Sequence, residues 1–255
     1  MTIATMDLSR KVALVTGGGR GLGRGMAGAL AAAGATVVLS SRTEPEVVEA
    51  ERAIEEGGGS AWALPWDLGD GATAPELVSR VVDRYGQIDV LVHAAGNQVR
   101  RPALELEAAQ WDEVVGLHLR AAFLLAQAVG RCMVERGEGG SIVFVGSVTS
   151  TRWGGPNLAA YCAAKSGLLG LMRSLAVEWG SHGIRVNAIL PGFFPTEMTR
   201  DVDDSPVRRA LTGRTPLQRL GRPDELGGAV LLLSSEAGSY ISGEAVTVDG
   251  GWSSA

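Results

Sequence analysis

The stretch "VTGGGRGLGRGMA", from Val15 to Ala27, decides the fold. It follows the short apolar run "KVALVT", which begins at Lys11, and it leads into a segment of helical character. Glycine lets a backbone turn tightly and approach other atoms closely. The first N–H groups of a helix have no partner inside that helix. The stretch therefore predicts a strand–turn–helix unit whose turn offers backbone donors to a ligand.

The same alternation continues to the end of the chain. Seven short runs rich in β-branched residues predict strands: "KVALVT" from Lys11, "ATVVLSS" from Ala35, "AWALPWD" from Ala61, "DVLVHAAG" from Asp89, "SIVFVGS" from Ser141, "IRVNAILPG" from Ile184 and "EAVTVDGG" from Glu244. Segments with apolar residues at helical spacing lie between them, among them Glu44–Glu56, Pro75–Tyr85, Ala108–Glu135 and Ala160–Gly180. Strands separated by helices must pair in parallel. We expect an α/β protein with a doubly wound, seven-stranded parallel sheet and helices on both faces.

No linker, composition shift or internal repeat divides the chain. We therefore expect one domain over residues 1–255.

Composition excludes several classes of function. The chain is 45% apolar and 20% charged, and its net charge of −5 is not arranged in blocks. This pattern argues against nucleic-acid and anionic-membrane partners. The apolar run "GGAVLLLSS", Gly227–Ser235, is too short to span a membrane. Two cysteines, Cys132 and Cys162, and a start unlike a signal peptide favour the cytoplasm. We expect no metal site.

The glycine loop has a recognisable spacing. Gly17, Gly21 and Gly23 form T-G-x-x-x-G-x-G, wider than the G-x-G-x-x-G fingerprint but with the same mechanics, and Gly19 and Leu22 complete the turn. Such a turn at a helix N-terminus can bind the phosphates of a dinucleotide. Taken alone, it is also compatible with a simple tight connection.

Cofactor choice is expected at the end of the second strand, which reads "LSSRTE". Ser41 and Arg42 there, and Arg20 in the glycine loop, suit a 2′-phosphate, so NADP(H) is favoured while NAD(H) remains possible. The alternative is that both arginines are solvated surface residues. Asp67, after the third strand, can accept from the adenine amino group or cap its own turn.

A second group of residues suggests chemistry. Tyr161 and Lys165 lie four residues apart at the start of an apolar helix, so both project from one face. An ammonium group nearby favours the phenolate. Ser147 ends the strand just before, where it can donate to a substrate carbonyl while Tyr161 transfers the proton. The trio predicts polarisation of a C=O group for hydride transfer.

Together the motifs identify the chain as similar, over almost its whole length, to the short-chain dehydrogenase/reductase family. The matching segments, in order, are "TGGGRGLG", "DVLVHAAG", Ser147 with "YCAAK", "RVNAILPG" and "VTVDGG". The resemblance implies a Rossmann-type sheet of seven strands, NAD(P)(H)-dependent interconversion of a ketone and a secondary alcohol, and usually a homotetramer. We thus expect residues 1–255 to form one dinucleotide-binding domain, with a substrate lid at about 193–214 inserted in it. It implies that Tyr161 is the acid/base, that Lys165 holds the nicotinamide ribose and lowers the pKa of Tyr161, and that Ser147 orients the substrate. It also implies cofactor contacts at Leu68, Ala95, Gly96, Pro191, Gly192 and Thr196.

Three positions depart from the family pattern. His93 begins "HAAG", where the family has N-N-A-G or N-A-A-G, and we expect it to supply a hydrogen bond within the sheet. His118 replaces the catalytic asparagine of V-N-L. It can keep a proton relay and titrate near neutrality, displace the relay water, or be a core histidine. Fourteen positions separate Ser147 from Tyr161, one more than is usual, which places an insertion in "TSTRWGGPN".

The substrate is left open. Arg100, Arg101 and Arg152 can recognise a carboxylate or simply be solvated. The segment "AGNQVRRP" resembles that of gluconate and deoxygluconate dehydrogenases in the family, whereas "PLQRLGRPDEL" is shared with 3-oxoacyl carrier-protein reductases. We expect an enzyme acting on a small carbonyl or alcohol; the alternative is a dinucleotide-binding sensor or structural subunit with little turnover, suggested by His93 and His118. The helices Ala108–Glu135 and Ala160–Gly180 are expected to pair across a two-fold axis.

Overall fold

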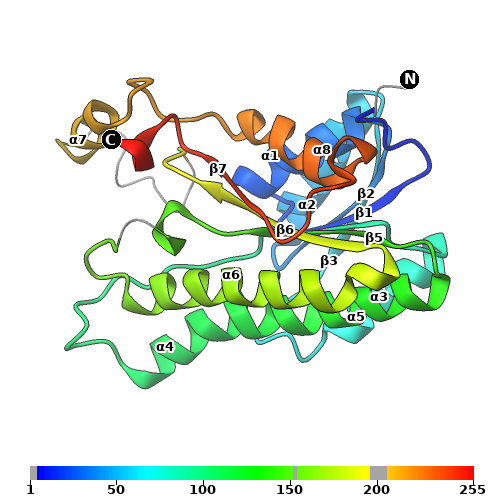
Figure 1. The fold of residues 1–255 in the computed structure, drawn as a ribbon, viewed down its shortest axis with the longest axis horizontal. Coiled ribbons are helices and arrows are strands. Elements are labelled where there is room, and N and C mark those ends of the chain that lie inside the picture. The colour runs from blue at the N-terminus through cyan, green and yellow to red at the C-terminus, as the bar shows by residue number, and fades with distance from the viewer. Residues whose placement is uncertain (1–4, 152–153, 196–205) are drawn as a thin grey trace.

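The computed structural model describes residues 5–151, 154–195 and 206–255. Seven parallel strands form one sheet in the order β3-β2-β1-β4-β5-β6-β7 (Figure 1). Their bounds are β1 Val12–Thr16, β2 Thr36–Ser41, β3 Ser60–Pro65, β4 Val90–His93, β5 Gly140–Val145, β6 Ile184–Pro191 and β7 Ala245–Val248. The winding reverses between β1 and β4, and such a switch point opens a crevice at the carboxyl ends of the strands.

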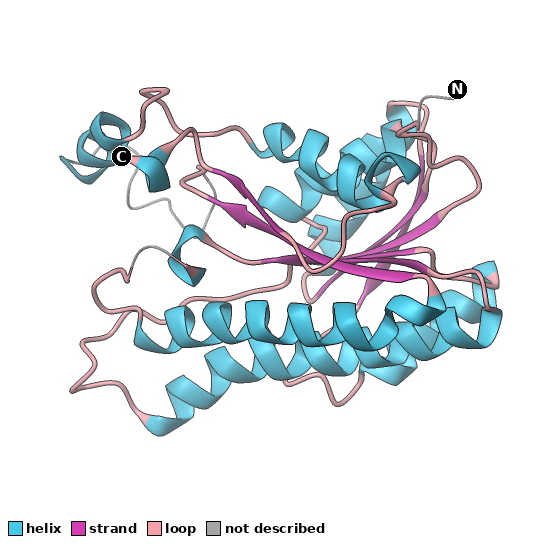
Figure 2. Ribbon diagram, viewed as in Figure 1, coloured by secondary structure: helices cyan, strands magenta, loops and turns pink. Residues whose placement is uncertain are grey.

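Helices cover both faces of the sheet (Figure 2). They are α1 Gly21–Ala32, α2 Glu44–Glu56, α3 Ala74–Tyr85, α4 Ala108–Val115, α5 Ala121–Arg136, α6 Ala159–Trp179, α7 Pro206–Arg214 and α8 Gly227–Ser234. Two apolar clusters result: side chains of α1, α2 and α8 pack on one face, and those of α3, α5 and α6 on the other. The prediction of a doubly wound seven-stranded parallel sheet is confirmed.

The expected helix Ala108–Glu135 is not regular throughout. A π-helical turn, Gly116–Arg120, joins α4 to α5. By length and composition alone, the helical run Ala108–Arg136 is apolar enough to cross a membrane. It contains no long uninterrupted apolar stretch, so the sequence pattern did not indicate this. In the fold, its inward side chains, among them Leu125 and Val129, are buried in the cluster beneath the sheet. A core helix of this kind is apolar because one of its faces is buried by protein.

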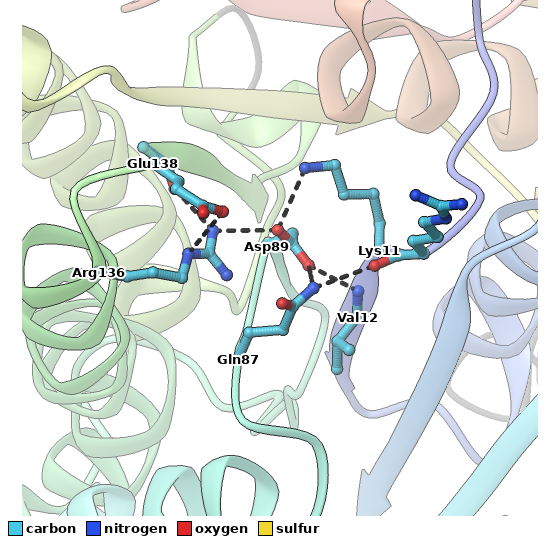
Figure 3. A network of polar contacts seen from close by, with 8 residues as sticks. Lys11, Val12, Gln87, Asp89, Arg136 and Glu138 are labelled. Atoms are coloured by element: carbon cyan, nitrogen blue, oxygen red, sulfur yellow. Dashed lines mark hydrogen bonds and ion pairs between the residues drawn. The ribbon is translucent and has the colours of Figure 1, made fainter.

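The amino ends of the strands are joined by a buried carboxylate (Figure 3). Asp89, 4% exposed, accepts from the Val12 amide at 2.8 Å, from Gln87 Nε2 at 2.7 Å and from Arg136 at 3.0 Å, and it pairs with Lys11 at 3.3 Å. Buried carboxylates persist where their lone pairs are satisfied. This network fixes β1, β4 and α5 at the edge of the sheet opposite the crevice.

Candidate active site

The glycine loop between β1 and α1 passes very close to the end of β4. Gly17 has a φ of +68°, and a Cβ there would lie 2.8 Å from the Ala94 backbone. Gly21 also has a positive φ, of +54°, and a Cβ on Gly23 would overlap the carbonyl oxygen of Gly17. Only glycine fits these positions without distortion. The spacing seen in the sequence therefore reflects steric demands of this turn.

A cavity of about 490 Å³ opens at the carboxyl edge of the sheet, beside this loop. Seventeen of the predicted site residues line it: Gly17, Arg20, Gly21, Leu22, Gly23, Ser41, Arg42, Asp67, Leu68, Ala95, Gly96, His118, Ser147, Tyr161, Lys165, Pro191 and Gly192. Gly19 lies behind the lining, where a Cβ would come 3.0 Å from the Cβ of Glu46 and 3.1 Å from Ser41 Oγ. Thr196 falls outside the described residues.

Several lining residues had no motif to reveal them. Glu46, from the first turn of α2, and Asn97, just after "HAAG", both face the cavity. Glu46 lies three residues after the "LSSRT" segment that ends the second strand, and this short separation could have predicted its place in the lining. Asp67 lines the cavity and also accepts from the Gly69 amide at 3.0 Å, so the capping alternative holds in the structure.

The end of the cavity beside β2 carries mixed charges. Arg20 NH1 lies 3.1 Å from Glu46 Oε1, and Arg42 lines the same end. Within the described part of the chain, the buried Oγ of Ser41 has no hydrogen-bond partner. A buried hydroxyl without a partner is costly unless a ligand satisfies it.

These features fit a dinucleotide. The glycine loop leaves space that a side chain would fill, and the first amides of α1 begin at its end. The orphaned Ser41 hydroxyl and the two arginines at the β2 end suit a phosphorylated ribose. The residues present therefore agree with NAD(P) in this cavity.

The serine, tyrosine and lysine predicted for catalysis lie together at the other end. Ser147 begins a short 3-10 turn, Val148–Ser150, after β5, and its Oγ accepts from the Thr149 amide at 3.2 Å. Lys165 is buried on α6 and donates to the Val145 carbonyl at 2.6 Å. Its Nζ lies 5.8 Å from the centroid of the Tyr161 ring. Fixing Lys165 to the end of β5 places its ammonium group beside the phenol.

Burial dominates the pKa values of Tyr161 and Lys165 in the protein alone. Burial raises the pKa of Tyr161, while the hydrogen bond with Ser147 and the charge of Arg100 act in the opposite direction. Burial also lowers the pKa of Lys165 to about 7. Lys165 is thus only partly protonated at neutral pH. In the protein without cofactor, desolvation is the largest influence on the pKa of the Tyr161 phenol. The lowering of the Tyr161 pKa by Lys165 stays a prediction for the enzyme with its cofactor bound.

His118 occupies the π-helical turn and faces the catalytic tyrosine. Its ring stands edge-on to Tyr161, with centroids 5.2 Å apart and planes at 86°. Its Nε2 lies 2.7 Å from the Asn97 carbonyl oxygen and 3.1 Å from the Asn97 amide nitrogen. A Cβ on Gly96 would come 2.5 Å from the ring, so the glycine after the fourth strand makes room for this imidazole.

Both buried histidines are neutral near pH 7. Burial, and then the charge of Lys165, hold the pKa of His118 well below its usual range and lower that of His93 to about 3. The suggestion that His118 titrates near neutrality was therefore wrong. His93 Nδ1 lies 3.0 Å from Thr16 Oγ1, and these residues are neighbours on β4 and β1. The predicted hydrogen bond within the sheet is confirmed.

The substrate side is formed by the segment after Gly96 and by the loop before α6. Arg100 donates to Gln98 Oε1 at 3.1 Å, and its charge reaches Tyr161. The Arg101 amide donates to the Asn157 carbonyl at 3.1 Å, which joins the two segments. Asn157 has a φ of +62° in the loop where the extra residue was expected. Arg152 lies outside the described residues.

A crevice at the switch point, a glycine loop and a Tyr–x–x–x–Lys pair beside a serine define a nicotinamide-dependent oxidoreductase class. The family model described as Enoyl-(Acyl carrier protein) reductase matches residues 17–253. The chain belongs to the short-chain dehydrogenase/reductase family. It is an NAD(P)(H)-dependent oxidoreductase that interconverts a ketone and a secondary alcohol by hydride transfer.

Relatives with different substrate names match the chain. The chain is 37% identical to the 2-dehydro-3-deoxy-D-gluconate 5-dehydrogenase of Dickeya dadantii, over 99% of both chains. It is 36% identical to a 3-oxoacyl-[acyl-carrier-protein] reductase of a Synechocystis species, over 96% of this chain and 97% of that one. A gluconate 5-dehydrogenase of Burkholderia cenocepacia, solved in complex with NADP and tartrate, superposes with a TM-score of 0.93 at 36% identity, covering 99% of each chain.

Proposed function

We propose that this enzyme is an NADP(H)-preferring dehydrogenase of small sugar acids, with Ser147, Tyr161 and Lys165 as its catalytic group. The observation that carries the proposal is that the segment bearing Arg100 begins at Asn97, which lines the cavity and is hydrogen-bonded to His118 beside Tyr161. A guanidinium on this segment is suited to hold a substrate carboxylate. The sugar-acid names of the relatives support the same class.

The chain's own side chains divide the chemistry. The Ser147 hydroxyl donates to the substrate oxygen, and Tyr161 gives its proton to that oxygen on reduction or takes it on oxidation. Lys165, anchored on Val145, places a positive charge next to the phenol when it is protonated, and that charge would favour the phenolate. When bound, the nicotinamide supplies the hydride donor or acceptor and, in its oxidised form, a further positive charge.

The cofactor would be held along the whole cavity. The amides of the loop from Gly17 to Gly23 would take the pyrophosphate. Arg20, Ser41 and Arg42 would take the 2′-phosphate of the adenine ribose, which is the reason for the NADP(H) preference. Further contacts are proposed at Asp67, Leu68, Ala95, Gly96, Pro191, Gly192 and, at the nicotinamide carboxamide, Thr196.

His118 is proposed to take the place of the family asparagine. Its Nε2 is fixed between the amide and carbonyl groups of Asn97, and its Nδ1 is buried without a partner in the described part of the chain. With Nε2 held by Asn97, the Nδ1 atom of His118 stays available for a proton relay with Lys165. His118 also anchors the Asn97 peptide, from which the segment carrying Arg100 begins.

Three wider features remain proposals. Residues 1–255 form one domain with a substrate lid at about 193–214, of which residues 196–205 lie outside the described residues; the protein resides in the cytoplasm, and it assembles as a homotetramer. Exposed apolar side chains on the helices beneath the sheet support assembly; they include Trp111, Phe123, Val134 and Val177. Sedimentation showing only monomer at micromolar concentration would contradict assembly.

The substrate class is tested by following nicotinamide absorbance with NADPH and NADH and their oxidised forms. The panel contains sugar acids and their keto forms, 3-oxoacyl thioesters, diketones and cyclic ketones. We expect turnover on sugar acids, and a loss of it in Arg100→Ala that appears mainly in KM. Turnover on 3-oxoacyl thioesters alone would overturn the sugar-acid assignment.

The cofactor preference is tested with Arg42→Asp. The introduced carboxylate repels a 2′-phosphate but not a 2′-hydroxyl. We expect a much larger loss of affinity for NADPH than for NADH. Equal losses for both cofactors would overturn the role of Arg42.

A further inference from the structure

Three segments meet around one glycine at the β2 end of the cavity. They are the glycine loop, the end of β2 and the first turn of α2. A Cβ on Gly19 would lie 3.0 Å from the Cβ of Glu46 and 3.1 Å from the Oγ of Ser41. A side chain at position 19 would separate these groups, so the glycine allows the Ser41 hydroxyl and the Glu46 carboxylate to share one small region of the lining.

The carboxylate in this region already engages a cation that the 2′-phosphate would need. Arg20 NH1 lies 3.1 Å from Glu46 Oε1, with the Glu46 side chain 27% exposed and that of Arg20 55% exposed. Both residues line the cavity, as do Ser41 and Arg42. The arrangement therefore contains two groups suited to a phosphate and one anion that competes with it.

We propose that Glu46 is a specificity-determining residue that competes with the 2′-phosphate for Arg20 and thereby keeps NAD(H) usable. The inference rests on the NADP(H) preference proposed above and refines it. An arginine whose Nη1 already pairs with Glu46 has fewer N–H groups left for a phosphate, and the nearby carboxylate repels the phosphate dianion. A 2′-hydroxyl has no charge to repel and can donate to a carboxylate. Glu46 thus weakens the binding of one cofactor and supports that of the other.

The same helix supplies a matched control. Glu49 pairs with Arg24 at 3.0 Å, about one turn further along α2, and the cavity lining described above includes neither residue. Glu49→Gln removes the same charge from the same helix without touching the cavity. Any effect of net charge or of helix stability is therefore common to the two variants, whereas competition for the phosphate is specific to Glu46→Gln.

The experiment measures the dissociation constants of NADPH and NADH by nicotinamide fluorescence, without substrate. It compares the full-length wild type with Glu46→Gln, Glu49→Gln, Arg20→Gln and the double variant Arg20→Gln/Glu46→Gln. We expect Glu46→Gln to shift the NADPH-to-NADH preference about fivefold toward NADPH, the scale of one exposed ion pair. Glu49→Gln should leave the ratio unchanged. In the Arg20→Gln background the Glu46→Gln shift should shrink, because the competition has lost its cation.

Ionic strength gives a second readout. The Debye length falls from about 30 Å at 0.01 M salt to about 3 Å at 1 M, so the difference between wild type and Glu46→Gln should diminish over that range. A ratio that Glu46→Gln leaves unchanged, or that Glu49→Gln shifts equally, would overturn the inference.

The failure of the underlying preference looks different. Arg42→Asp reports on the phosphate site without involving Glu46. If Arg42→Asp weakens NADPH selectively while Glu46→Gln changes nothing, only the role of Glu46 is lost. If the wild type binds NADPH no more tightly than NADH and Arg42→Asp lowers the affinity for both equally, the proposed NADP(H) preference itself is wrong, and the Glu46 inference falls with it.

Discussion

The Nε2 atom of His118 meets both polar groups of the Asn97 peptide unit, at 2.7 Å from the carbonyl oxygen and 3.1 Å from the amide nitrogen. An imidazole nitrogen either donates or accepts, depending on the tautomer. Each tautomer of His118 therefore finds a partner on Asn97, and neither leaves Nε2 unsatisfied. The π-helical turn that carries His118 is thereby tied to the segment that begins the substrate side.

This tie predicts how replacements of His118 behave. His118→Ala should raise KM for the substrate and lower kcat/KM by about 10- to 100-fold, because the Asn97 segment and the relay position are both lost. His118→Asn should recover most of kcat, since an amide also donates and accepts. NADPH affinity should change little in either variant. Steady-state kinetics with a separate cofactor titration would check this; kcat and KM both within twofold of wild type in His118→Ala would contradict it.

Gly96 and His118 should be energetically coupled. A Cβ on Gly96 would come 2.5 Å from the His118 ring, so Gly96→Ala forces the imidazole or the segment to move. Overpacking of this kind costs about 1–3 kcal/mol. In the background of His118→Ala the ring is absent, and Gly96→Ala should cost much less. Urea unfolding of the four proteins measures the cycle, and strictly additive losses would argue against the contact.

The assignment of Tyr161 as acid/base has a direct test. Tyr161→Phe removes the hydroxyl but keeps the ring that packs edge-on against His118 at 5.2 Å. Turnover should fall by at least about 100-fold, the scale of general acid–base catalysis, while NADPH still binds. Fluorescence titration controls for binding. Turnover equal to wild type would refute the role, whereas a wild type silent on every substrate would favour the sensor alternative.

The buried histidines predict acid sensitivity. His93 has a folded pKa of about 3 against an ordinary value of 6.5, so the unfolded chain binds more protons between these limits. Stability is then retained above pH 6.5 and is lost as pH falls toward 3. Between pH 7 and pH 5, His93 alone should cost about 2 kcal/mol, and His118, whose pKa is also lowered, adds to the loss.

The measurement is urea unfolding at several pH values for wild type and His93→Asn. The amide has no proton to gain, so the variant should lose less stability between pH 7 and pH 5. His182 is exposed, so His182→Asn serves as a control that should leave the pH profile unchanged. Parallel pH profiles for wild type and His93→Asn would contradict the prediction.

The sequence by itself determined the sheet and most of the cavity lining. Alternating strands and helices require parallel pairing with covered faces, and parallel strands bring their carboxyl ends to one edge. Residues that follow strands, such as Gly17, Ser41, Gly96 and Ser147, therefore gather there whatever the details of packing. The spacing of Tyr161 and Lys165 needed only the period of a helix.

Tertiary structure alone decided the properties that depend on surroundings. Burial lowers the pKa of Lys165 to about 7, raises the pKa of Tyr161 and keeps His118 neutral. No local sequence pattern shows how completely a side chain will be desolvated. The Arg20–Glu46 pair joins residues from two different helix starts, 26 positions apart. Such a contact exists only once the strands have been placed side by side, because sequence periodicity fixes the face of each element and not its neighbours.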